Sequence, residues 1–164
     1  MQLLSTLRQV DIFYEIPDEH LTQLIPLCEE SSYKKGGIIV QENSPSDEIY
    51  IIVDGIVEIV IDPSLLDPNS NDIEPTVIAT LWPGQTFGEI GLVDRGMRSA
   101  SARSSADKTV VLSISRDGLL GLCDSDHHFG YLLMRNIASD LAFKVRNTDL
   151  MLREQLLWQA RPPV

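Results

Sequence analysis

Hydrophobic residues change their spacing twice along this chain. Near the N-terminus they recur every three or four residues, from Leu3 to Phe13 and from Leu21 to Leu27, as in helices. Between Ile38 and Ile114 they alternate with polar residues or form short blocks that end at proline, glycine or asparagine, which is typical of strands. From Asp126 to Gln159 the helical spacing returns over one long segment.

These three parts predict one domain of the α+β class that is mainly β. Its 164 residues, 43% of them hydrophobic, are enough for a single core of ordinary size. We expect an antiparallel β-roll, or jelly roll, with helices before it and a long helix after it. The predicted boundaries are 1–30 for the N-terminal helices, 31–116 for the β-roll and 117–160 for the C-terminal helices.

Turn residues punctuate the predicted strands. Asp54-Gly55 is typical of a hairpin turn, and Pro83-Gly84 ends a strand predicted from Thr76 to Leu81. The segment from Asp62 to Pro75 is rich in Asp, Asn, Ser and Pro, so we expect a mobile hairpin loop without chemistry. Pro17 and Asp18 mark the start of the second helix.

The long C-terminal helix is predicted to carry an apolar stripe. It would span about 50 Å at 1.5 Å per residue, which is longer than a domain of this size covers. Its distal half is therefore expected to pack against a second copy, giving a homodimer; the alternative is a kinked pair of helices folded back on the β-roll. The stripe consists of Leu133, Ile137, Leu141, Val145, Thr148, Leu152 and Leu156.

The segment from Phe87 to Ser101 combines the residue types that a sugar phosphate needs. Glu89 follows Gly88 in what we expect to be a tight bend, and its carboxylate can accept hydrogen bonds from sugar hydroxyls. Nine positions later, Arg98 offers a planar fork of donors that suits a phosphate. Ser99 and Ala100 are small enough for their backbone N–H groups to approach an anion.

This segment resembles the phosphate-binding cassette of cyclic nucleotide-binding domains, the family of catabolite activator proteins and protein kinase A regulatory subunits. The resemblance extends from about Leu7 to Ala160 and includes Gly37 to Val40 and Asp47 to Ile59. It implies that Glu89 binds the ribose 2′-hydroxyl and Arg98 the exocyclic phosphate oxygens. The binding residues that it implies are Phe87, Gly88, Glu89, Ile90, Gly91, Arg98, Ser99 and Ala100, with backbone groups completing the cradle.

The chain departs from the family pattern at two positions. Asn43 stands where the family usually has glycine, and Asn is the non-glycine residue that best tolerates a positive φ. Met97 stands where proline is usual, which leaves the loop before Arg98 less rigid and weakens ligand affinity without removing a contact.

The resemblance also implies that the long helix closes over the base. Arg146, Asn147 and Thr148 are the polar residues placed to offer hydrogen bonds to a purine edge, and Thr148 is taken as the binding residue. The alternative is that each of them faces water.

The charge, the length of the apolar runs and the cysteine spacing limit the partners and the location of the protein. A net charge of −11 without a basic cluster argues against nucleic acid, and it makes Arg98 a local exception in an acidic protein. The longest apolar run, Ile49 to Val53, is far too short for a membrane helix, so we expect a cytoplasmic protein that does not enter a membrane. Cys28 and Cys123 have no metal-site spacing and are expected to be buried, reduced thiols.

An enzyme is the main competing class, because metal-dependent cupins share the β-roll. A cupin site takes histidines from its strands, whereas His20, His127 and His128 all lie outside the predicted roll. Asp126 is expected to cap the long helix, with His127 and His128 exposed. We therefore expect no catalytic residues, no metal and no cofactor.

The sequence thus predicts a domain that binds a cyclic nucleotide, cAMP by default or cGMP, and signals to an unknown protein effector through movement of the long helix. The chain ends at Val164, which leaves no room for a helix-turn-helix, so direct DNA reading is not expected. The alternative is a degenerate domain that kept the fold as a dimerisation scaffold and lost the nucleotide.

Overall fold

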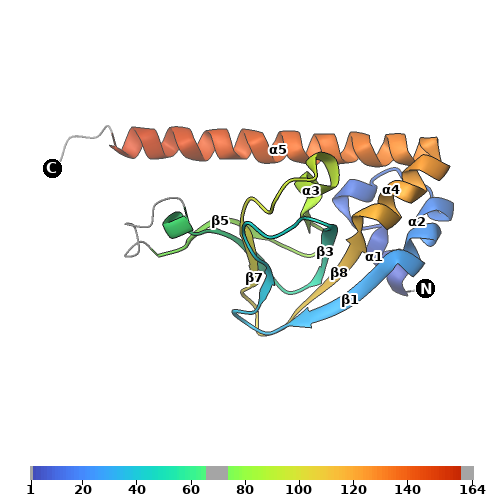
Figure 1. Ribbon diagram of the computed structural model, residues 1–164, viewed down its shortest axis with the longest axis horizontal. Helices are drawn as coiled ribbons and strands as arrows, with labels where there is room; N and C mark the ends of the chain where they lie inside the picture. The colour runs from blue at the N-terminus through green and yellow to red at the C-terminus, as the bar shows by residue number, and fades with distance from the viewer. Residues whose placement is uncertain (1, 66–73, 160–164) are drawn as a thin grey trace.

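The structure is a computed structural model that describes residues 2–65 and 74–159. Helices occupy both ends of the chain and strands its middle, as the sequence predicts (Figure 1). The helices are α1 (Gln2–Leu7), α2 (Asp18–Leu24), α3 (Glu89–Asp94), α4 (Arg116–Ser125) and α5 (His127–Gln159), with short 3₁₀ turns η1 (Asp11–Phe13), η2 (Ile25–Leu27) and η3 (Pro63–Leu65). The strands are β1 (Cys28–Tyr33), β2 (Ile38–Val40), β3 (Glu48–Asp54), β4 (Val57–Ile61), β5 (Thr76–Leu81), β6 (Thr86–Phe87), β7 (Ser101–Ser104) and β8 (Thr109–Ser115).

The strands form two antiparallel four-stranded sheets, in the orders β1-β8-β3-β6 and β2-β7-β4-β5. Strands β3 and β8 pair along their length and are buried over most of it, which accounts for their nearly continuous apolar sequences. The α+β fold with an antiparallel β-roll, N-terminal helices and a long C-terminal helix is therefore confirmed. The first strand begins at Cys28, slightly before the predicted start of the roll.

The turn at Asp54-Gly55 is not a hairpin, so that prediction was wrong. Gly55 has the positive φ of 88° that such a turn needs. However, β3 pairs with β8 and β6, whereas β4 pairs with β7 and β5. The chain reverses at Gly55 and crosses to the other sheet, because turn residues specify the reversal but not the pairing partners of the strands on either side.

Helices pack against one end of the β-roll and form the larger core. Phe13, Leu21, Leu119, Phe129 and Leu133 are among its fully buried side chains, which come from all the helical regions. Asn136 of α5 is buried there too, and its side-chain amide donates to the backbone carbonyls of residues 12 and 14. These bonds dock α5 onto the N-terminal segment.

Helix α5 is continuous, so the alternative of a kinked pair is rejected. Asp126 caps it as predicted, since its carboxylate accepts hydrogen bonds from the N–H groups of His128 and Phe129. Figure 1 shows α5 spanning the molecule, with α4 and the N-terminal helices at its start and α3 beneath its middle. The side chains of the apolar stripe are buried at Leu133 and Ile137, whereas those from Val145 onward are exposed to solvent.

The predicted loop from Asp62 to Pro75 lies mostly outside the described residues. Its first part is described and forms η3, in which the Asp62 carboxylate accepts hydrogen bonds from the N–H and hydroxyl of Ser64. The strand that follows, β5, has the predicted bounds.

Candidate functional site

The backbone turn at Gly88 sets the position of the Glu89 carboxylate. Gly88 follows the short strand β6 and has a φ of 87°, which turns the chain sharply into α3. The predicted bend before Glu89 is confirmed, but Glu89 is itself the first residue of a helix, which the sequence did not predict. Its side chain points inward and only 3% of the residue is exposed.

Glu89 is held by a lysine from the long helix. The Nζ atom of Lys144 lies 2.9 Å from Oε1 of Glu89 and 2.7 Å from Oδ2 of Asp140, one helical turn earlier. Burial lowers the pKa of Lys144, but the two carboxylates raise it by more, so the ammonium stays charged at neutral pH. Among the described residues, the other oxygen of Glu89, Oε2, has no hydrogen-bond partner although it is buried.

Arg98 lies on the other side of Gly88. Its guanidinium donates to the carbonyl of Glu48 at 2.8 Å and to that of Gly88 at 3.5 Å, and its Cζ lies 5.4 Å from the centre of the Tyr50 ring. Arg98 is 6% exposed, and within the described part of the chain its Nε–H finds no acceptor.

The backbone of Arg98 is fixed by the turn that contains Asn43. The N–H of Asn43 donates to the Arg98 carbonyl, and the Arg98 N–H donates to the Ser44 carbonyl, both at 2.9 Å. Asn43 has a φ of 61°, so the expectation that asparagine can replace glycine there is confirmed. Met97 is exposed and bridges to Pro45.

Two glycines allow the close approach of these segments. A Cβ on Gly88 would lie 2.4 Å from Nη1 of Arg98, and one on Gly91 would lie 1.7 Å from Oγ of Ser46. Larger residues at either position would push α3 away from the Ser46 to Glu48 segment.

The other predicted binding residues differ in exposure. The Phe87 ring stacks on Tyr50 with centroids 5.0 Å apart. Ile90 and Ser99 are exposed, and Ala100 is half-buried. Thr148 is exposed and its hydroxyl donates to the Lys144 carbonyl, so it lies one turn beyond the contact with Glu89. Its neighbours Arg146 and Asn147 are exposed as well.

A cavity of about 520 Å³ reaches one side of this region. This volume lies within the usual range for small-molecule sites, about 300–1,000 Å³. Arg98, Tyr50 and Glu48 line it together with residues of β2 and the turn after it, whereas Glu89 does not. The cavity therefore gives access to the arginine, and Glu89 is not among its lining residues.

Sequence reasoning missed Lys144. The spacing of Asp140 and Lys144 indicates an i,i+4 pair on one helix face. Nothing in the spacing tells that this face meets Glu89, which is 55 residues away along the chain.

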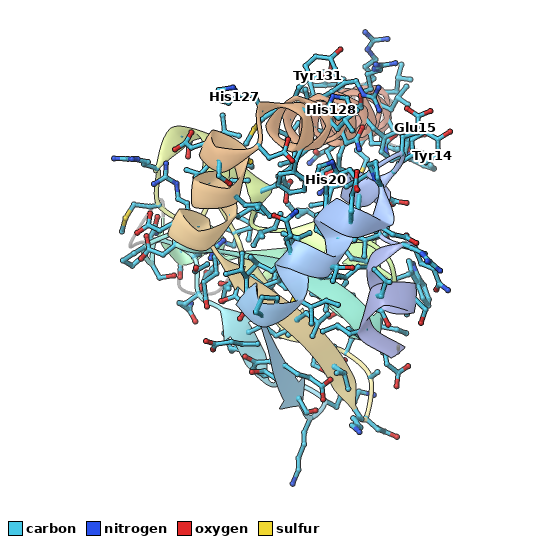
Figure 2. The ribbon with its side chains drawn as sticks, turned by 90° about the vertical axis from the view of Figure 1, so that its right-hand side faces the viewer. Tyr14, Glu15, His20, His127, His128 and Tyr131 are labelled. Atoms are coloured by element: carbon cyan, nitrogen blue, oxygen red, sulfur yellow. The ribbon has the colours of Figure 1, made fainter. Side chains whose placement is uncertain are left out.

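The histidines and cysteines are not arranged as a metal centre. Figure 2 shows His20 on α2 beneath the start of α5, where its Nδ1 lies 2.9 Å from Oδ2 of Asp126. His127 and His128 are exposed, as predicted. Over residues 2–65 and 74–159, no three His, Cys, Asp or Glu side chains are placed to hold a metal ion. Cys28 and Cys123 are free and half-buried, and burial raises the pKa of each thiol to about 11.

No helix in the described ranges has the length and apolar character needed to cross a membrane.

Gly88, at a positive φ, thus lies beside a buried carboxylate, Glu89, and a buried arginine, Arg98, in the β-roll. The chain belongs to the cyclic nucleotide-binding domain family, whose model matches residues 30–126. The predicted resemblance is thereby confirmed.

This chain is similar to two curated proteins in sequence and to a solved structure in fold. The cyclic AMP receptor protein of Thermus thermophilus is 29% identical over 86% of this chain, which spans 60% of that protein. Human cGMP-dependent protein kinase 2 is 28% identical over 71% of this chain. A cyclic nucleotide-binding domain from Methylobacillus flagellatus has a TM-score of 0.76 at 23% identity, with 93% of this chain and 82% of that chain covered.

The match to the kinase covers little of the kinase. This chain spans 14% of its length, so the similarity concerns a segment the size of a binding domain. The Methylobacillus flagellatus structure covers most of both chains, and its likeness shows the same fold.

Proposed function

We propose that this domain binds a cyclic nucleotide, with cAMP as the ligand, and acts as a regulatory sensor without catalytic activity. The observation that supports this most directly is a pair of buried, unpartnered polar atoms flanking Gly88 in the part of the chain that the structure describes. Oε2 of Glu89 is an acceptor and Nε–H of Arg98 is a donor. A ligand with a hydroxyl and an anionic phosphate would satisfy both.

The proposed roles follow from these atoms. Glu89 accepts a hydrogen bond from the ribose 2′-hydroxyl, and Arg98 donates to an exocyclic phosphate oxygen. Backbone groups of five residues complete the cradle: Gly88, Ile90, Gly91, Ser99 and Ala100. Phe87 supports the site by stacking on Tyr50, and Thr148 faces the base. We propose cAMP over cGMP because cAMP is the ligand that the family resemblance implies by default. The Thermus thermophilus relative is named for cAMP.

Signalling is proposed to pass through α5, because that helix contacts the site at Lys144. A ligand shifts the position of the helix only by the difference between its affinities for the two arrangements. The effector that responds to this signal is proposed to be a protein in the cytoplasm, where the two free thiols would remain reduced.

Thermal unfolding tests the proposed function. A ligand at 100 times its dissociation constant stabilises the folded state by about 2.7 kcal/mol, so saturating cAMP is expected to raise the melting temperature by several degrees. Linear 5′-AMP is the control and should give a much smaller shift. Equal melting temperatures with and without cAMP and cGMP would contradict nucleotide binding and favour the dimerisation scaffold.

The distal half of α5 supports a proposed homodimer. From Val145 onward its described side chains are exposed, and a surface this apolar is unusual on a monomer. Its large hydrophobic side chains are Val145, Leu150, Met151, Leu152, Leu156, Leu157 and Trp158.

A double substitution tests this dimer. Leu152→Glu with Leu156→Glu places charges on one face of the helix and is expected to convert a dimer to a monomer in sedimentation experiments. Gln155→Glu is the matched control, because it adds a charge on the same turn without removing an apolar side chain. A wild-type protein that sediments as a monomer at all concentrations would contradict the proposal.

A further inference from the structure

Three oxygen atoms surround the ammonium group of Lys144. Its Nζ donates hydrogen bonds to Oε1 of Glu89 and to the carbonyl of Thr86, at 2.9 and 3.0 Å, and forms an ion pair with Oδ2 of Asp140 at 2.7 Å. Two of these oxygens belong to the β6–α3 segment and one to α5 itself. Contacts in three directions hold the ammonium group in one place.

Lys144 supplies the positive charge next to two carboxylates, those of Glu89 and Asp140. Glu89 is almost fully buried and Asp140 is half-buried, and Lys144 is the cation that contacts both carboxylates. A buried carboxylate that loses its cation becomes strongly unfavourable, which favours its turning toward water. Such a turn would move the Glu89 oxygens away from the position in which they face a ligand.

Lys144 contacts only one of the two Glu89 oxygens. Oε1 receives the ammonium, while Oε2 is buried and, among the described residues, has no partner. The lysine therefore fixes the plane of the carboxylate and leaves the second oxygen available as an acceptor. Because both Lys144 and Asp140 lie on α5, this arrangement depends on where the helix sits.

We infer that Lys144 is a positioning residue for sugar recognition: it holds the Glu89 carboxylate in the orientation in which Oε2 can accept a hydrogen bond from the ligand's 2′-hydroxyl. This inference rests on the proposed function, since it assigns the 2′-hydroxyl to Glu89. Lys144 acts through Glu89 and does not itself touch the ligand. Discrimination between ribose and deoxyribose thereby depends on a residue of the long helix.

Titration with cAMP and 2′-deoxy-cAMP tests the inference. Lys144→Met should weaken cAMP binding about tenfold, comparable to one lost charge-assisted hydrogen bond, while binding of 2′-deoxy-cAMP changes little. Lys144→Arg should restore most of the preference for ribose, and the exposed Lys35→Met is the matched control. Equal losses for both nucleotides would overturn the inference, because a merely structural role does not depend on the 2′-hydroxyl.

A second measurement does not need a nucleotide, so it separates failure of this inference from failure of the proposed function. The side-chain ammonium of Lys144 should give a slowly exchanging ¹⁵N signal in NMR spectra, and Glu89→Gln should shift that signal and speed its exchange. If wild-type protein binds neither nucleotide but this signal depends on Glu89, the proposed function fails while the contact stands. If the chemical shift and exchange rate of the Lys144 signal are the same in the Glu89→Gln variant as in the wild type, the positioning role is overturned.

Discussion

Replacement of Arg98 by alanine is expected to weaken cyclic nucleotide binding by about thirtyfold or more. Hydrogen bonds to a charged group contribute about 1.5–3 kcal/mol each, and a loss of about 2 kcal/mol corresponds to that factor. The guanidinium is buried between the Glu48 carbonyl and Gly88, with its Nε–H unused by the described residues. It is therefore the cation already positioned for a phosphate, and calorimetric titration measures its contribution.

Two variants make this prediction specific. Arg103→Ala on β7 removes an arginine that pairs with Glu58 at 2.9 Å, and it should leave affinity unchanged. Arg98→Lys keeps the charge but loses the planar fork, so its affinity should lie between wild type and Arg98→Ala. Circular dichroism checks that each variant is folded. An Arg98→Ala protein that is folded and binds as tightly as wild type would remove Arg98 from the mechanism.

Gly91→Ala is expected to destabilise the domain and impair the site together. The added Cβ would lie 1.7 Å from Oγ and 2.2 Å from Cβ of Ser46, so α3 or the Ser46 segment must move. Overpacking of this kind costs about 1–3 kcal/mol. Because Glu89 is on the same short helix, the shift should weaken nucleotide binding as well. Urea denaturation gives the stability and titration gives the affinity.

The same substitution elsewhere provides the control. A Cβ on Gly121, in α4, would meet no atom within 4 Å, so Gly121→Ala should be neutral or stabilising by up to about 1 kcal/mol. Adding Ser46→Gly to Gly91→Ala removes both clashing atoms and should recover part of the lost stability. A Gly91→Ala protein as stable as wild type would show that α3 does not need this close approach.

Much of the fold could be predicted from the sequence because each element carries its own local signal. The strand-like run from Thr76 to Leu81, followed by the turn at Pro83-Gly84, located β5 with its correct ends. Asp126 predicted the start of α5 through its ability to cap backbone N–H groups. The glycine and arginine of the site were found in the same way, because a tight bend and an anion cradle need particular residue types over a short stretch.

Features that depend on distant contacts could not be predicted. The residues of the Asp54-Gly55 turn look like those of a hairpin, yet β3 and β4 join different sheets. Glu89 and Lys144 are 55 residues apart, and only the docking of α5 on the core brings them together. The contact between His20 and Asp126 could not be predicted either, because only the packing of α2 against the start of α5 brings the two side chains together.

Nucleotide binding itself is tested most directly by isothermal titration of the wild-type protein with cAMP and with cGMP. We predict saturable binding of cAMP at one site per chain, at micromolar concentration and more tightly than cGMP. Tighter binding of cGMP would correct the ligand but keep the sensor. The absence of heat from either nucleotide, with a protein that is folded by circular dichroism, would contradict the proposed function.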